Sequence, residues 1–137
     1  MHVREATSTD CDAVIALWTS AGLTRPWNDP ALDFERARSG PTSCVLVGIV
    51  DERPVATAMV GFDGHRGWVY YLAVAADHRR VGAGRRMMAE AEQWLNTRGA
   101  PKVELMVRTG NDEATAFYTA LGYDRVEVEV LARWLRP

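Results

Sequence analysis

Hydrophobic residues in the N-terminal part of the chain recur at helical spacing. After Thr9, a plausible N-cap, apolar side chains fall at i, i+3, i+4 and i+7 on one face: Val14, Leu17, Trp18 and Ala21. Gly22 is expected to end this helix, and a second, short helix is predicted over Leu32–Arg38, before Gly40-Pro41. A short strand that starts at Val3 is predicted to precede both helices.

Apolar runs typical of strands fill the middle of the chain. Cys44–Val50 and Val55–Val60 are joined by Asp51-Glu52-Arg53-Pro54, a run typical of a hairpin turn. Asp63-Gly64-His65-Arg66-Gly67 predicts a further turn, and Trp68–Val74 predicts the strand that follows it.

The second half of the chain alternates helix and strand. One helix is expected to carry an apolar stripe of Gly84, Met87, Met88, Ala91 and Leu95 and to end at Gly99 and Pro101. A strand over Val103–Val107 follows, and the last helix is marked by Ala114, Phe117, Tyr118 and Leu121, with Gly122 as its cap. Val126–Trp134 predicts a final strand or pair of strands. The expected order is β-α-α-β-β-β-α-β-α-β, an α/β fold with a mixed sheet and helices on both faces.

Composition is typical of a compact globular protein. The chain has 137 residues, 47% of them hydrophobic and 25% charged, which predicts one globular domain over residues 1–137. Its net charge of −2 argues against nucleic acid as a partner. Cys11 and Cys44 show no metal-ligand spacing and no disulfide framework, so we expect no metal. No leader and no apolar run of membrane length is visible, so we expect a cytoplasmic protein with no membrane contact. We expect a monomer or a homodimer.

The most informative stretch runs from Leu72 to Met88. It passes from an apolar strand, through a basic loop containing Gly82 and Gly84, directly into an amphipathic helix. Backbone N–H groups at a helix start have no intrahelical partner and attract anions, which glycine allows to approach closely. Four arginines flank this start: Arg79, Arg80, Arg85 and Arg86. The pattern favours a pyrophosphate site over a merely solvated basic helix start.

The glycine spacing excludes two common phosphate motifs. No Walker run is present, and Met87 stands where a dinucleotide fingerprint needs its third glycine. The remaining pattern, Arg79-x-x-Gly82-x-Gly84, resembles the pyrophosphate-binding signature of the GNAT N-acetyltransferases. The run from Asn111 to Tyr123 resembles that family's second signature, Asn-x-x-Ala-x-x-Phe-Tyr-x-x-x-Gly-Phe/Tyr.

The resemblance extends over essentially the whole chain. It starts with Arg4-x-Ala6-Thr7-x-x-Asp10. Three further runs are similar to the YpeA-type bacterial branch: Arg25-Pro26-Trp27-Asn28-Asp29-Pro30, Asp63-Gly64-His65-Arg66-Gly67 and Tyr70-Tyr71-Leu72. The substrate of that branch is unassigned.

This resemblance implies acetyl-CoA as the acyl donor. Its pantetheine arm would enter a V between the strands at Trp68–Val74 and Val103–Val107, where backbone groups would pair with it. The implied CoA-binding residues are Leu72, Ala73, Val74, Arg79, Arg80, Val81, Gly82, Ala83, Gly84, Arg85, Asn111 and Tyr118. Asn111 could cap the last helix as well as contact the pantetheine.

The resemblance also implies catalytic roles. Tyr118 matches the family's acid, which would protonate the departing thiolate of CoA; the alternative is a ring that only packs beside Phe117. No base is evident. Glu104 and His65 are the candidates, although each could simply be an exposed residue, and the amine could also arrive neutral or lose its proton to water.

The family uses the connection between its first two helices as one wall of the acceptor site. Trp27, Asn28 and Asp29 are therefore the implied substrate-binding residues, unless Trp27 only fills the core. The acceptor would be a small-molecule amine or a peptide N-terminus. The alternative function is an acyl-CoA-binding regulatory module without turnover.

Overall fold

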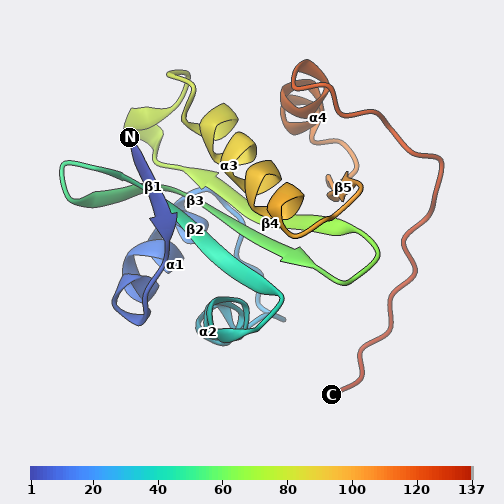
Figure 1. Ribbon diagram of the computed structural model, residues 1–137, viewed down its shortest axis with the longest axis horizontal. Coiled ribbons are helices and arrows are strands. Elements are labelled where there is room, and N and C mark those ends of the chain that lie inside the picture. The colour runs from blue at the N-terminus through green and yellow to red at the C-terminus, as the bar shows by residue number, and fades with distance from the viewer. Residues whose placement is uncertain (137) are drawn as a thin grey trace. The chain divides into compact units, whose positions relative to one another are not determined.

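The computed structural model describes residues 1–136 and divides the chain into two compact units, Met1–Met106 and Val107–Pro137. Figure 1 shows the elements of both. The first unit holds a five-stranded sheet in the order β1-β2-β3-β4-β5. Its strands are β1 (His2–Glu5), β2 (Ser43–Val50), β3 (Arg53–Phe62), β4 (Gly67–Val74) and β5 (Val103–Glu104). The first four pair antiparallel, and β5 joins β4 in parallel, which makes the sheet mixed as predicted.

The turn between β2 and β3 is tighter than the sequence predicted. Asp51 and Glu52 have φ values of 49° and 63°, so they form a two-residue hairpin loop in which Val50 pairs with Arg53. Two successive positive φ values match the right-handed twist of the flanking strands. Arg53 and Pro54, expected in the turn, therefore belong to β3.

Three helices belong to the first unit: α1 (Cys11–Ser20), α2 (Pro30–Ser39) and α3 (Ala83–Thr97). Thr9 does not cap α1 as expected, because a short 3₁₀ turn over Ser8–Asp10 precedes the helix and Thr7 begins that turn. The helix α2 starts earlier than predicted. Pro30 suits its first position, and the Asp29 carboxylate accepts from the backbone N–H of Leu32 at 3.2 Å.

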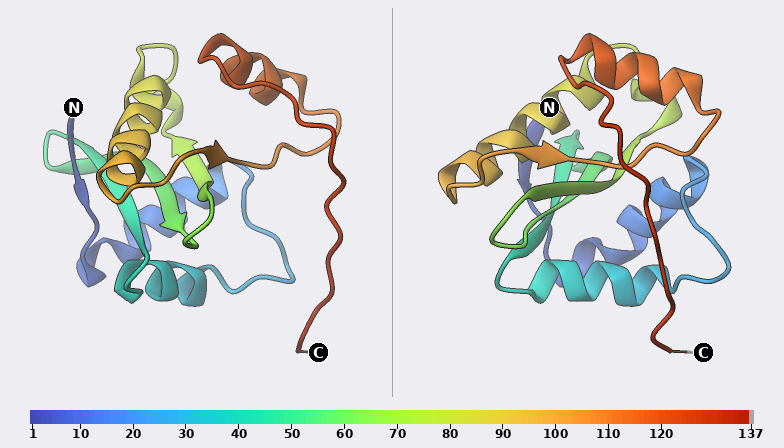
Figure 2. Two further views of the ribbon diagram at one scale, coloured as in Figure 1. Left: turned by 45° about the vertical axis from the view of Figure 1, so that its right-hand side comes forward. Right: turned by 90° about the vertical axis from the view of Figure 1, so that its right-hand side faces the viewer.

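Helices cover both faces of this sheet. Val45 and Val47 of β2 pack with the fully buried Trp18 and Phe34 of α1 and α2, whereas the next side chain, Leu46, points to the opposite face. That second face is covered by α3, with the predicted stripe of Met87, Met88, Ala91 and Leu95 buried. Figure 2 shows α3 on one side of the sheet and α1 with α2 on the other.

Gly67 lets α3 approach the first residue of β4. A Cβ at this position would lie 2.7 Å from Cδ1 of Leu95. A side chain here would force the buried Leu95 side chain to shift. The contact fixes the start of β4 under the C-terminal half of α3.

The second unit contains α4 (Asp112–Ala120), whose N-terminus is capped by the Asn111 side chain accepting from Ala114 N at 3.1 Å. Gly122, with φ of 97°, follows its end as predicted. The expected strand at Val126–Trp134 is wrong: the described residues form no strand after β5, and Val128 and Val130 are 73% and 67% exposed. Alternating valine and glutamate suits a strand, but a strand forms only with a hydrogen-bonding partner.

No helix among the described residues combines the length and the apolar character needed to cross a membrane.

Candidate functional site

The turn between β4 and α3 presents backbone N–H groups to solvent. Gly82 is the N-cap of α3 with φ of 86°, and no side chain caps the helix. Arg80 also has a positive φ, 64°. Backbone that alternates hand in this way, followed by free N–H groups of a first helical turn, forms a concave anion-binding surface. This segment, residues 79–85, is called the glycine turn below.

The two glycines contribute differently. Gly82 has open space around the position that its Cβ would occupy, with nothing within 4 Å. Glycine is therefore favoured here by the positive φ and not by a close contact. Gly84 lies inside α3 and is not among the residues with positive φ, so it adds no unusual conformation. The conformational requirement of the glycine turn therefore rests on Gly82.

Charge around the glycine turn is positive. The first turn of α3 has no acidic residue. Arg86 pairs with Glu90 at 3.0 Å on the same helix, and Arg79 donates from Nε to the carbonyl oxygen of Val74 at 3.2 Å. The exposed Arg80 and Arg85 form no ion pair among the described residues, which leaves two cationic side chains beside the free N–H groups.

The strand β4 has an unpaired edge next to this turn. Its parallel pairing with β5 covers only Gly67↔Val103 and Trp68↔Glu104. Within the part of the chain that the structure describes, Ala73 and Val74 pair with β3 on one edge, and residues Leu72–Val74 pair with no strand on the other. The predicted strand Val103–Val107 ends at Glu104, and the two strands share no pairing beyond that point. An extended ligand could hydrogen-bond to this free edge as an added strand does.

Neither candidate base lies at that edge. His65 sits in the turn before β4, roughly 20 Å along the strand from Leu72. Glu104 is paired in register with Trp68, and its carboxylate contacts Arg66 at 3.5 Å and Lys102 at 3.7 Å. Glu104 therefore forms ion pairs at the start of β4, and the roles of His65 and Glu104 as bases stay predictions.

The connection between α1 and α2 exposes one large aromatic side chain. Trp27 is 56% exposed, so it does not fill the core. Asn28 is half-buried, and Asp29 is engaged as the cap of α2. Trp27 and Asn28 are therefore available to a ligand, whereas the Asp29 carboxylate is already used by the fold.

Tyr71 is a feature of the site that the sequence did not predict. Its φ is 52°, in the left-handed region, where the register between β3 and β4 shifts. Its ring stacks on Trp18 with centroids 3.9 Å apart, and its hydroxyl donates to Asp33 Oδ2 at 2.8 Å. Burial and the neighbouring Asp33 carboxylate raise the pKa of Tyr71 to about 12. Strained backbone of this kind costs on the order of 1–3 kcal/mol and gathers at functional sites.

In the second unit, Tyr118 packs edge-on against Phe117 and Tyr123, with ring centroids 5.0 Å and 5.8 Å away. Burial raises the pKa of its phenol. The group is therefore protonated at neutral pH, as a proton donor must be. Its role toward CoA, and that of Asn111, stay predictions.

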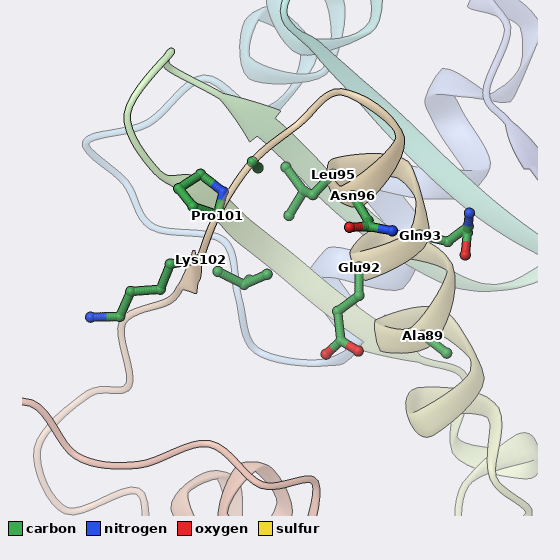
Figure 3. A pocket seen from close by; sticks show the side chains of 9 residues that line it. Ala89, Glu92, Gln93, Leu95, Asn96, Pro101 and Lys102 are labelled. Atoms are coloured by element: carbon green, nitrogen blue, oxygen red, sulfur yellow. The ribbon is translucent and has the colours of Figure 1, made fainter.

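A cavity of about 410 Å³ lies at the other end of α3 (Figure 3). Side chains from the helix, including Glu92 and Asn96, line it together with Pro101 and Lys102 from the segment that leads into β5. The cavity lies along Ala89–Asn96 of α3, and its nearest lining residue is roughly 9 Å along the helix from Ala83 in the glycine turn. It is not part of the candidate site.

Comparison with known proteins identifies the class. The model of the acetyltransferase (GNAT) family matches residues 12–123. An acetyltransferase of Pectobacterium atrosepticum, ECA0875, is 40% identical over 135 residues, covering 98% of this chain and 96% of the relative. The chain therefore belongs to the GNAT acetyltransferase family.

Solved structures agree on the fold. A mutant form of the BH1408 protein from Bacillus halodurans has a TM-score of 0.78 at 25% identity, covering 99% of this chain and 100% of that one. The aminoglycoside acetyltransferase AAC(6')-Iy, in complex with the bisubstrate analogue CoA-S-monomethyl-acetylneamine, has a TM-score of 0.84 at 14% identity, with 97% of each chain covered. At that identity the second likeness establishes the fold alone.

Proposed function

We propose that this protein transfers acetyl from acetyl-CoA to a primary amine by direct attack in a ternary complex. One observation carries the proposal: an uncapped helix start flanked by free arginines lies next to an unpaired strand edge. The first suits a pyrophosphate and the second suits an amide-bearing pantetheine arm. Both groups occur in CoA, in this order along the molecule.

The donor would be held by backbone more than by side chains. Amides of Leu72, Ala73 and Val74 would pair with the pantetheine. The glycine turn would hold the pyrophosphate through its N–H groups, with Arg80 and Arg85 adding charge. The Arg79 side chain would act mainly by fixing the turn on Val74. Asn111 would contact the pantetheine while it caps α4.

Acetyl transfer requires a neutral amine and a proton donor for the departing thiolate. The neutral amine attacks the thioester carbonyl, the carbon–sulfur bond breaks, and the electron pair leaves with the sulfur. Tyr118 donates its phenolic proton to that thiolate and regains one from the proton lost by the nitrogen, through water. The products are an N-acetylated amine and CoA with a free thiol.

The acceptor would be a small-molecule amine or a peptide N-terminus, held near Trp27 and Asn28. An amine acceptor is supported by the likeness in fold to AAC(6')-Iy, an aminoglycoside N-acetyltransferase. The YpeA-type branch remains our proposed placement within the family. A cytoplasmic location belongs to the same proposal and is supported by the free thiols of Cys11 and Cys44.

The test is free thiol release from acetyl-CoA in the presence of a panel of amines and short peptides, with the acetylated product identified by mass. The proposal predicts one thiol released for each acetyl group transferred. Tight acetyl-CoA binding without thiol release across the panel would contradict it and would favour an acyl-CoA-binding regulatory module.

A further inference from the structure

Asp33 is a carboxylate with a fixed position and no cationic partner. It lies half-buried in the first half of α2, and Oδ2 accepts the hydroxyl of Tyr71 at 2.8 Å. None of the ion pairs among the described residues includes Asp33. A carboxylate that is partly withdrawn from water and unpaired is favourable for a cation to approach.

Several unusual features of the fold hold the Asp33 carboxylate in place. Tyr71 has a left-handed backbone at a break in strand register, and its ring is fixed by stacking on the fully buried Trp18. Arg25 acts electrostatically on the Tyr71 hydroxyl, but its guanidinium donates to the carbonyl oxygens of Gly22 and Thr24 at 2.7 Å and 3.0 Å. Asp33 therefore forms no ion pair with Arg25 among the described residues.

The same face of the sheet leaves two buried polar atoms without partners. Thr57 pairs in register with Val47 and Ala73, so its side chain shares the face that carries Trp18. Trp18 Nε1 and Thr57 Oγ1 are both fully buried and have no hydrogen-bond partner among the described residues. Unsatisfied buried polar groups are rare in folded proteins, so each calls for an explanation, of which a functional role is one.

The location fits the approach of an acceptor. Tyr71 directly precedes Leu72–Val74, the free edge of β4. The Asn28 side chain also hydrogen-bonds with the Tyr71 hydroxyl. The exposed Trp27 directly precedes Asn28 in the chain. A cationic amine here would meet an anion and could find an aromatic face beside it.

We propose that Asp33 binds the ammonium group of the acceptor and that Tyr71 is the positioning residue that holds the Asp33 carboxylate. The inference rests on the proposed function, because the expected place of the acetyl group is the adjacent edge of β4. It identifies the acceptor as a primary amine that arrives positively charged and loses one proton to water before its neutral nitrogen attacks the thioester. Tyr71 acts only through Asp33, so its hydroxyl affects acceptor binding without contacting the donor.

A purely structural role is the competing account. The Tyr71–Asp33 hydrogen bond joins α2 to β4, and its loss would then lower stability without changing ligand preference. Three variants separate the accounts: Asp33→Asn, Tyr71→Phe and, as a matched control, Glu35→Gln. Glu35 is an exposed carboxylate on the same helix that pairs with Arg38. Its replacement removes an equal charge at a different position.

The experiment measures binding of 1,4-diaminobutane, a polyamine, an aminoglycoside and a free-N-terminal peptide to the CoA-bound protein. Each probe is compared with an uncharged counterpart, in which hydroxyl replaces the amine or acetyl caps it. The parent should prefer at least one charged probe, and Asp33→Asn should weaken that probe by roughly ten- to hundredfold. Tyr71→Phe should weaken it severalfold, with the Trp18 stacking retained. Glu35→Gln should bind like the parent.

Two results would overturn the inference: a folded Asp33→Asn protein that keeps the parent's preference for the charged probe, or a parent that shows no such preference. Melting temperatures of all variants identify any loss that is only structural. Failure of the proposed function would look different, because acetyl-CoA would then not bind or its thiol would not be released, whatever the amine preference.

Discussion

The guanidinium of Arg79 donates from Nε to the carbonyl oxygen of Val74 at 3.2 Å and so ties the glycine turn to the last residue of β4. Val74 also borders the unpaired edge of that strand. One side chain thus links the two places where the pantetheine and the pyrophosphate of CoA are expected. The link gives Arg79 a different role from Arg85, which makes no such contact among the described residues.

That difference predicts distinct consequences for Arg79→Ala and Arg85→Ala. Removal of Arg85 should weaken CoA by about 1–3 kcal/mol and leave pantetheine unaffected, because only a charge-assisted phosphate contact is lost. Removal of Arg79 should weaken CoA and also, to a smaller extent, pantetheine, because the end of β4 loses its tether. Calorimetric titration of both variants with CoA, dephospho-CoA and pantetheine measures this. Equal losses of all three ligands in the Arg85→Ala variant would mean that this arginine only supports the fold.

Tyr118→Phe tests the proposed acid. The change removes one oxygen and keeps the ring that packs against Phe117 and Tyr123, so the fold should survive. Turnover should fall by about 10²–10⁴-fold, with acetyl-CoA affinity nearly unchanged, because the loss lies in the transition state. Phe117→Ala is the comparison, since it should mainly cost stability through a cavity. A folded Tyr118→Phe enzyme with parental turnover would remove Tyr118 from the mechanism.

The hydrogen-bonded carboxylate of Asp10 is expected to make the free energy of unfolding fall at acid pH. Its buried carboxylate accepts from Arg4 at 2.7 Å and 3.1 Å and from Thr7 N at 2.8 Å. The hydrogen bond from Arg4, opposed by burial, holds the pKa of Asp10 below its usual range. A lowered folded-state pKa means that this stabilisation is complete above the unfolded pKa of about 3.9 and is lost as pH falls through the folded value.

Asp10→Asn should therefore destabilise the protein by about 1–3 kcal/mol at pH 7 and flatten its stability profile below pH 4. Urea unfolding between pH 7 and pH 2.5 gives both quantities. Glu35→Gln, which removes an exposed carboxylate paired with Arg38, is the control and should follow the parent closely. Parallel pH profiles for the parent and Asp10→Asn would show that this carboxylate does not titrate in linkage with folding.

Hydrophobic spacing was sufficient to predict most of the fold. The buried stripe of α3 and the order of elements up to α4 follow from periods of 3.6 and 2 that each segment shows by itself. The strand at Val126–Trp134 was predicted wrongly for the same reason. Its alternation is local, whereas strand formation depends on a partner elsewhere in space.

The candidate site was predictable in part. Gly82 was identified because glycine at a helix start lets an anion approach the backbone; its positive φ shows that the turn favours glycine there, and the anion site stays a prediction. The left-handed conformation of Tyr71 leaves no such trace, since tyrosine normally avoids it and only a register shift between β3 and β4 creates it. Its contact with Asp33 joins residues 38 positions apart, beyond the reach of local spacing.

Titration of acetyl-CoA into Gly82→Asp tests the central claim most directly. Gly99→Asp is the matched control, because Gly99 has φ of 83° and equally open surroundings at the other end of α3. Both variants introduce the same backbone strain and the same charge, so both should lose similar stability. The account predicts that Gly99→Asp binds acetyl-CoA like the parent, whereas Gly82→Asp shows no measurable binding, because its carboxylate faces the pyrophosphate. Parental affinity in a folded Gly82→Asp protein would contradict the account and place the donor elsewhere.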